Sequence, residues 1–467
     1  MRRLVCVSNR ISVPRKSTAP GGLAVGILNA LKRTGGLWFG WGGETTQHEP
    51  GEPDIHIRAG VTYATIELRQ VEYELYYNGY ANNLLWPLFH YFLRDMRYSA
   101  EERDAYENVN RIFAQRLLPL LQPQDLVWVH DYHLIPLGRL LRESGLRQPI
   151  GFFLHIPFPN IEMLRVLPAY AELLRDLTHY DVVGFQTEND LRAFHSGIEH
   201  LFGHEAIRAD NRIRVGDRLL HADVFPIGVD VEAIQSQATA AMQTDVVKRM
   251  VDSLMSRALM VGVDRLDYSK GLVERFNAYQ QFLETYPENR GHITYIQIAP
   301  LSRTDVRAYA NMRQALEQVA GRTNGRFGDT DWTPIRYLNR NFPHTTLLGF
   351  LRAANVGIVT PLRDGMNLVA KEFVAAQDPD NPGVLILSTL AGAARELSTA
   401  LLVNPYDTRT VSHAMQAALE MPLPERRERH TAMLEVLRRN DLSAWARRFI
   451  DALEQSAGMQ AHVRVAG

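Results

Sequence analysis

The sequence has very little cysteine: Cys6 is its single copy among 467 residues. A disulfide within the chain is therefore excluded, and the apolar run LVCV around Cys6 is typical of a buried strand. The start, MRRLVCVSNR, is basic, but its apolar run is too short for a signal peptide. No apolar run reaches the length that crosses a membrane. These absences favour a reducing, cytoplasmic location.

The sequence also lacks an excess of charge of one sign, since 51 Lys and Arg face 52 Asp and Glu. Neither a polyanion-binding surface nor an acidic tail is expected, so nucleic acid and membranes are not predicted partners. Low-complexity tracts and internal repeats are absent too. The hydrophobic fraction of 46% is ordinary for a globular protein, and the length predicts two domains of roughly 200 residues each.

Short apolar runs alternate with helical patterns along the chain. The runs are nearly continuous, which is typical of parallel strands covered on both faces; they lie at 3–9, 125–130, 150–155, 181–186, 258–264, 293–299, 355–361 and 383–388. Helical patterns such as 101–121 and 272–286 lie between them, and 41–62 is predicted as a polar loop or a β-excursion. The sequence thus predicts an α/β fold with two doubly wound, Rossmann-like domains.

A polar, alanine- and glutamine-rich segment follows residue 230 and marks the predicted domain boundary. We place the first domain at 1–235 and the second at 236–441. Two such domains would face a cleft, and ligands should collect at the carboxyl ends of the strands that face it.

Polar residues follow the predicted strands repeatedly, as expected of a site at those ends. They are Arg10, His130, Asp131, His133, His155, Arg265, Asp267, Lys270 and Asp364. The arginine and lysine of DRLDYSKG suit a diphosphate, although a surface turn with i,i+4 pairs explains the same spacing equally well. The pair Gly21 and Gly22 does not form the nicotinamide fingerprint G-x-G-x-x-G, but a loop whose backbone amides approach an anion fits it.

The stretch VTPLRDGMNLVAKE, residues 359–372, runs from a strand through a charged turn into a helix. Its polar groups suggest a ligand with hydroxyls and negative charge. Three other patterns could suggest a functional site, but ordinary structural roles explain them as well. HDYH lacks a third metal ligand, Asp131 and Asp364 have no known separation that would make them a glycosidase pair, and the aromatic cluster at 76–92 is either core or a wall for a sugar.

Taken together, these motifs resemble the trehalose-6-phosphate synthases, retaining glycosyltransferases of family 20 with two Rossmann-like domains (GT-B). The resemblance runs nearly end to end, through LVCVSNR, GGLAVGILNAL, GLWFGWGGE, NNLLWPLFHY, VWVHDYHL, GFFLHIPFP, GFQTEND, DRLDYSKGL, YIQIAPLSR, VTPLRDGMNLVAKEFVAAQ and PGVLILS. It implies transfer of glucose from an NDP-glucose, with UDP-glucose the expected donor, to glucose 6-phosphate.

The resemblance also implies a role for individual residues. The donor would be held by Gly22, Arg265, Lys270, Phe342, Asp364, Gly365, Met366, Asn367, Leu368 and Glu372. The acceptor would be held by Arg10, Trp41, Tyr77, Trp86, Asp131 and Arg303. The residues nearest the chemistry would be Arg265, Lys270, Asp364, His155 and Asp131, and Glu372 would bind the ribose hydroxyls.

The same resemblance implies that no cofactor is required, with a loosely bound Mg²⁺ at the diphosphate left open, and that no protein metal site exists. It implies a homo-oligomer, a dimer or a tetramer, and a final helix and tail at 442–467 that packs back on the first domain. Two alternatives stay open at this point. One is a transferase with another phosphorylated acceptor, such as glycerol 3-phosphate, and the other is a non-catalytic sugar-phosphate sensor on the same fold.

Overall fold

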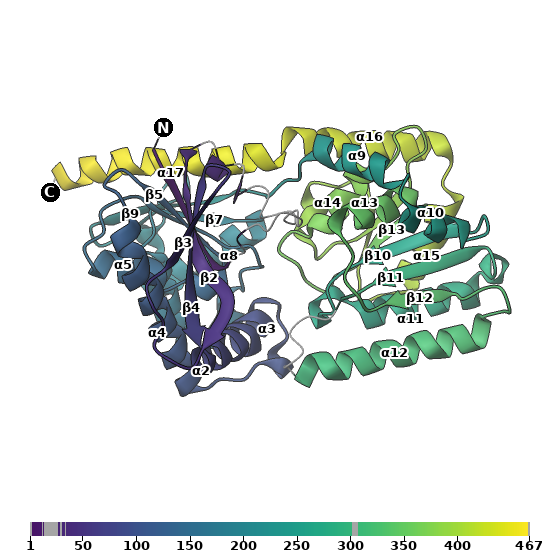
Figure 1. Ribbon diagram of the computed structural model, residues 1–467, viewed down its shortest axis with the longest axis horizontal. Coiled ribbons are helices and arrows are strands. Elements are labelled where there is room, and N and C mark those ends of the chain that lie inside the picture. The colour runs from purple at the N-terminus through teal and green to yellow at the C-terminus, as the bar shows by residue number, and fades with distance from the viewer. Residues whose placement is uncertain are drawn as a thin grey trace. The chain divides into compact units, whose positions relative to one another are not determined.

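The computed structural model describes residues 2–11, 13, 27–28, 30–32, 34–300 and 307–465 (Figure 1). The chain forms two compact units. Unit 1 comprises Met1–Ile227 and Ser443–Gly467, and unit 2 comprises Gly228–Leu442. Within the described ranges, no helix is both long and apolar enough to cross a membrane.

Unit 1 contains a sheet with the strand order β3-β4-β2-β1-β5-β6-β7-β9-β8 in the part of the chain that is described. Its strands are β1 (Leu4–Arg10), β2 (Leu37–Thr46), β3 (Asp54–Arg58), β4 (Val61–Arg69), β5 (Leu126–His130), β6 (Ile150–Phe153), β7 (Val182–Phe185), β8 (Arg212–Val215) and β9 (Arg218–Val224). Neighbours pair in parallel except in the edge hairpins β3–β4 and β8–β9. Every residue of β5, β6 and β7 is buried, as expected of parallel strands covered on both faces.

Helices connect these strands or pack against them. They are α2 (Gln70–Glu72), the π-helix η1 (Tyr73–Leu85), α3 (Trp86–Phe89), α4 (Ala100–Leu117), α5 (Leu137–Glu143), α6 (Ile161–Leu164), α7 (Tyr170–Leu177), α8 (Glu188–Phe202) and α17 (Leu442–Val465). From β1 the chain passes to β2 on one side, and it later reaches β5 on the other side of β1. The carboxyl ends of β1 and β5 therefore form a topological switch point, the place where doubly wound sheets bind ligands.

Helix α17 packs against the central strands of unit 1. The ring of Phe449 stacks on Trp128 of β5 with centroids 4.5 Å apart, and Trp445 lies 5.0 Å from the same indole. A Cβ on Gly151 of β6 would lie 2.6 Å from the Phe449 ring. Only glycine lets the helix approach the strand this closely, so the chain's last helix is part of the core of its first unit.

Unit 2 contains a six-stranded sheet with the order β12-β11-β10-β13-β14-β15 within the described residues. Its strands are β10 (Ala258–Val263), β11 (Ile293–Ile298), β12 (Ile335–Leu338), β13 (Val356–Val359), β14 (Val384–Ser388) and β15 (Leu401–Val403). All of them pair in parallel. The switch point lies between β10 and β13, which places the carboxyl ends of these two strands beside each other.

Helices cover both faces of this sheet (Figure 1). They are α9 (Val231–Ala241), α10 (Asp245–Asp252), α11 (Leu272–Thr285), α12 (Arg307–Phe327), α13 (His344–Ala353), α14 (Leu368–Ala376), α15 (Thr408–Glu420) and α16 (Leu423–Arg439). Helix α11 packs with α12 and α15, while α13 packs with α9, α10 and α14.

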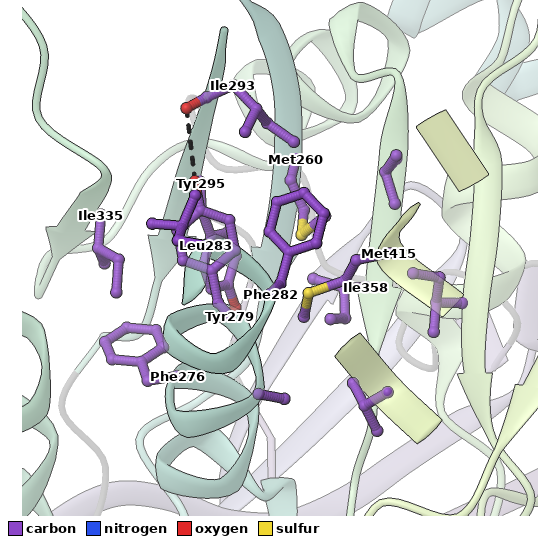
Figure 2. Close-up of a cluster of buried hydrophobic side chains, with 14 of the residues drawn as sticks. Met260, Phe276, Tyr279, Phe282, Leu283, Ile293, Tyr295, Ile335, Ile358 and Met415 are labelled. Atoms are coloured by element: carbon purple, nitrogen blue, oxygen red, sulfur yellow. Dashed lines mark hydrogen bonds between the residues drawn. The ribbon is translucent and has the colours of Figure 1, made fainter. Parts of the chain in front are cut away.

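The buried face of α11 shows why the sheet and helices of unit 2 hold together (Figure 2). Phe276, Tyr279 and Phe282 recur at helical spacing and are fully buried. They pack in one cluster with Met260 of β10 and Tyr295 of β11. Each such aromatic side chain contributes about 1.5–3 kcal/mol through burial.

The prediction of two doubly wound α/β domains is confirmed. The eight predicted apolar runs form strands β1, β5, β6, β7, β10, β11, β13 and β14. The predicted polar loop or β-excursion at 41–62 belongs to the sheet as the end of β2, all of β3 and the start of β4. Strands β8, β9, β12 and β15 were not predicted, because they are only partly buried.

The observed boundary differs from the predicted one. The segment after residue 230, expected as a polar boundary stretch, forms α9 and α10 of unit 2, and the units divide between Ile227 and Gly228. Gly228 lies against the end of α16, since a Cβ there would be 2.0 Å from the Asn440 carbonyl oxygen. The polar composition of α9 suggested a boundary segment, but the helix packs against α13 and α14 and so belongs to unit 2.

Candidate active site

The loop after β10 brings a lysine to the switch point of unit 2. Asp267 accepts a hydrogen bond from the Ser269 amide at 2.9 Å and starts the turn that carries Lys270. Gly271 ends this turn with φ +64°, and a Cβ there would lie 2.6 Å from the Thr360 carbonyl oxygen. Glycine is required for the conformation and for the close approach. The backbone thus fixes where Lys270 and the exposed Arg265 leave the loop.

The turn after β13 supplies the partner of that lysine. Lys270 Nζ donates to Asp364 Oδ2 at 2.5 Å, and the Asn367 side-chain amide donates to the same oxygen at 3.0 Å. Asn367 Oδ1 in turn accepts from the Ala370 amide at 3.2 Å and caps α14. A cation, a carboxylate and the amino end of a helix therefore meet in one place, an arrangement suited to a ligand with phosphates and hydroxyls.

This turn is held in an unusual backbone conformation. Asn367 has φ +76°, a strained value for a residue other than glycine. The segment after β14 fixes the turn, since the Gly392 amide donates to the Asp364 carbonyl at 3.1 Å and the Ala393 amide to the Met366 carbonyl at 2.8 Å. Such strain persists only where the surroundings determine it, and it marks functional sites.

A buried arginine that the sequence reasoning missed supports both loops. Arg275 of α11 donates to Asp264 at 2.7 Å, to Thr360 at 2.9 Å and to the Lys270 carbonyl at 3.1 Å. It thereby ties the end of β10 to the end of β13. Its position one turn into an ordinary amphipathic helix gave no sequence signal beyond one charge on the apolar face.

Two further predicted donor residues lie near the amino ends of α13 and α14. Glu372 accepts a hydrogen bond on Oε1 from His344 Nε2 at 3.0 Å, and this contact raises the pKa of His344. Phe342 precedes α13, its ring packed on Phe350 with centroids 5.4 Å apart and under the Arg340 guanidinium. His344 is another residue that sequence reasoning missed.

In unit 1, Asp131 and His155 stand at the carboxyl ends of β5 and β6. Asp131 has φ +76°, its amide donates to the Phe153 carbonyl at 2.8 Å, and its Oδ1 accepts from the His155 amide at 3.2 Å. Burial lowers the pKa of His155 to about 3, and His130 lies 3.2 Å away, nitrogen to nitrogen. His155 is therefore neutral near pH 7 and acts as a hydrogen-bonding group rather than a cation.

The predicted acceptor residues of unit 1 form an aromatic cluster beside Arg10. The guanidinium of Arg10 lies 5.5 Å from the Trp41 ring, and the Trp41 and Tyr77 rings are 6.2 Å apart. Tyr77 stacks between Tyr73, at 5.3 Å, and His133, at 5.6 Å. Arg10 is exposed and Tyr77 is half-buried, so both can reach a ligand.

Trp86 lies deeper than its predicted role in acceptor binding suggests. It is 4% exposed, and its ring packs on His90 at 4.1 Å and on Tyr132 at 5.8 Å. Its contacts therefore support the residue next to Asp131. Gly22 and Arg303 lie outside the described residues. No group of three or more His, Cys, Asp or Glu among the described residues could hold a metal ion.

The structure thus collects the predicted residues into two groups. Arg265, Lys270, Phe342, Asp364–Leu368 and Glu372 belong to unit 2, and Arg10, Trp41, Tyr77, Trp86, Asp131 and His155 belong to unit 1. Their roles in binding, and a common cleft between the units, stay predictions. The strand orders and the strand-end groups place the protein in the class of doubly wound α/β proteins that bind ligands at switch points.

Comparison with known proteins identifies the family. The model of glycosyltransferase family 20 matches residues 4–455, and the chain belongs to this family. A trehalose-6-phosphate synthase of Klebsiella pneumoniae is 47% identical over 468 residues, covering 100% of this chain and 98% of that protein.

Two solved structures are similar over nearly the whole chain. One is a UDP-forming α,α-trehalose-phosphate synthase of Burkholderia xenovorans in complex with glucose-6-phosphate, with a TM-score of 0.93, 47% identity and coverage of 97% of this chain and 100% of that one. The other is the Escherichia coli protein bound with UDP-2-fluoro glucose, with a TM-score of 0.92, 47% identity and coverage of 97% and 99%.

Proposed function

We propose that the protein transfers glucose from UDP-glucose to glucose 6-phosphate with retention of configuration, giving trehalose 6-phosphate and UDP. The names of its relatives support this reaction: those of Klebsiella pneumoniae and Burkholderia xenovorans are trehalose-phosphate synthases, the latter UDP-forming. Their bound molecules, glucose-6-phosphate and a UDP-glucose analogue, are an acceptor and a donor of this kind.

The observation that carries the proposal is the meeting of Lys270, Asp364 and the capped start of α14 at one switch point. A nucleotide sugar presents a diphosphate next to a ring of hydroxyls. The cation and the helix amides suit the diphosphate, and the carboxylate and amide oxygens suit the hydroxyls.

In the proposed reaction, the bond between the glucose anomeric carbon and the UDP oxygen breaks, and its electron pair stays on the diphosphate. The acceptor's anomeric hydroxyl forms the new bond on the same face of the sugar and gives its proton to the leaving phosphate. Negative charge grows on the leaving oxygen, so Arg265 and Lys270 stabilise the transition state more than the ground state.

On the acceptor side we assign Arg10 to the phosphate of glucose 6-phosphate, together with Arg303. Trp41 and Tyr77 would flank the sugar, because aromatic faces suit the apolar faces of a pyranose. Asp131 would accept hydrogen bonds from sugar hydroxyls, and the neutral His155 would donate or accept one, which orients the reacting groups.

Several further parts of the proposal rest on the family resemblance. Unit 1 would bind the acceptor and unit 2 the donor, with the loop of Gly22 closing over the donor. We propose that the enzyme needs no cofactor, that it works in the cytoplasm, and that it assembles as a dimer or tetramer.

A grid of donors and acceptors tests this function. The purified protein is incubated with UDP-, GDP- or ADP-glucose and with glucose 6-phosphate, glycerol 3-phosphate or no acceptor, each with and without EDTA. We expect nucleoside diphosphate release above background only with UDP-glucose and glucose 6-phosphate, unaffected by EDTA, and an α,α-linked product by NMR. Release with glycerol 3-phosphate, or sugar-phosphate binding without release, would contradict the proposal.

A further inference from the structure

A histidine holds the carboxylate that faces the predicted ribose position. His344 is the first residue of α13, and Glu372 lies in the second turn of α14, a helix that packs against α13. Their side chains meet at 3.0 Å between Nε2 and Oε1. The side chains of His344 and Glu372 are 27% and 12% exposed, so the pair lies at the edge of the core and remains accessible.

The chemistry of the contact fixes which atom donates. An ionised carboxylate only accepts hydrogen bonds, so the proton between the two groups is on His344 Nε2, whether the imidazole is neutral or charged. Both influences that raise the pKa of His344 come from Glu372: the hydrogen bond first, and then the attraction of its charge. The contact occupies one lone pair of Oε1, and the other acceptor positions of the carboxylate stay available for hydroxyls.

We propose that His344 is a positioning residue for nucleotide binding: it orients the Glu372 carboxylate toward the two vicinal hydroxyls of the donor's ribose. This inference rests on the proposed function, because it takes Glu372 as the ribose ligand. A glutamate has three rotatable side-chain bonds, and a free one loses rotamer entropy when it binds. Because His344 already holds the carboxylate in place, Glu372 loses little further rotamer entropy when the ribose binds. The resulting gain in nucleotide affinity therefore requires the two ribose hydroxyls.

Neighbouring residues are consistent with this assignment. Phe342, two residues before His344, is a predicted donor-binding residue, and its ring packs on Phe350. Lys371, adjacent to Glu372 in the sequence, is fully buried and paired with Glu396 at 2.5 Å. Glu396 thus compensates the charge of Lys371, and His344 donates the hydrogen bond that orients Glu372.

The test compares UDP with 2′,3′-dideoxy-UDP, which lacks both ribose hydroxyls. Binding of each nucleotide to the full chain is measured by calorimetry for the wild type, His344→Phe, which keeps a ring but no donor, and His344→Gln, whose amide nitrogen replaces Nε2. Thr345→Ala, at the exposed next position, is the matched control.

We expect His344→Phe to weaken UDP about 10-fold, the size of one hydrogen bond to a charged group, and to leave dideoxy-UDP unchanged. His344→Gln should restore UDP binding, and Thr345→Ala should bind like the wild type. In kinetics, His344→Phe should raise the KM for UDP-glucose with kcat unchanged. Equal weakening of both nucleotides would mean a merely structural role and would overturn the inference, as would no change in either or a wild type that does not distinguish them.

The result is separable from that of the donor and acceptor grid. Loss of transfer in the grid with His344-dependent discrimination intact would reject the proposed reaction and keep this inference. Transfer in the grid, without a His344-dependent difference between UDP and dideoxy-UDP, would keep the proposed reaction and reject this inference.

Discussion

The strand-end groups of the two units are held in place by different kinds of interaction. In unit 2 they are held by ion pairs: Lys270 with Asp364, Arg275 with Asp264, and Lys371 with Glu396. In unit 1 they are held by stacked rings and neutral imidazoles, with Tyr77 between Tyr73 and His133 and with His130 beside His155.

The difference follows from what each group is proposed to bind. A diphosphate whose charge grows during the reaction needs cations, and cations can be buried only when carboxylates compensate them. A sugar ring needs flat apolar faces and hydrogen bonds of fixed direction, which aromatic and imidazole rings supply. The two units share a topology, and their side chains give them different chemistry.

The largest effect should come from breaking the buried ion pair of unit 2. Arg275→Met leaves Asp264 buried without its partner, and we expect a loss of about 3–5 kcal/mol in the free energy of unfolding, measured in urea. The double variant Arg275→Met with Asp264→Leu should recover part of this loss, since no uncompensated charge remains. A single-variant cost below about 1 kcal/mol would show that the ionic network is not what supports unit 2.

Removing the site lysine should come next. We expect Lys270→Ala to lower kcat by about 10²–10³, or about 3–4 kcal/mol, because it removes a group that stabilises the developing charge. Lys270 is 13% exposed and paired with Asp364, so the variant should also lose some stability, and its turnover is measured well below its melting temperature. Lys248→Ala, at an exposed position of α10, is the control. Turnover of Lys270→Ala equal to that of the wild type would remove the proposed role.

The pH dependence of stability should have opposite signs at two histidines. His155 has a lowered pKa of about 3, so the unfolded chain binds its proton first, and this stability is present above about pH 6.5 and falls as the pH drops toward 3. His344 has a raised pKa, so its contribution is present below about pH 6.5 and is lost as the pH rises through the folded value.

Melting temperatures between about pH 5 and pH 8 test this pair. We expect His155→Gln to flatten the acid-side loss of stability and His344→Gln to leave that loss in place or deepen it. Identical slopes for both variants and the wild type would contradict the contrast between the neutral His155 of unit 1 and the carboxylate-paired His344 of unit 2.

The smallest expected effect is at the acceptor cluster. Arg10→Ala should raise the KM for glucose 6-phosphate about 10-fold, the value of one charge-assisted contact, with the KM for UDP-glucose unchanged. Arg58→Ala on β3, also exposed, serves as the control. A rise in the donor KM instead would show that the two ligand sites are divided differently.

The sequence by itself determined the fold class and the strands that form the two sheet centres. Those strands are continuous apolar runs because both of their faces are covered, so composition alone marks them. Lys270 and Asp364 were found for a related reason, since each lies in the loop that follows such a run, where parallel strands end at a common edge. Their predicted roles came from the resemblance.

What only the tertiary structure decided are the contacts between residues far apart in the chain. Arg275 and Asp264 are eleven positions apart and Thr360 follows strand β13, and no local period relates them. The same holds for His344 with Glu372, and for Phe449 of the last helix on Trp128. The local hydrophobic pattern of a segment indicates that the segment is buried. Which other segment it packs against depends on the strand order, and packing of the whole unit sets that order.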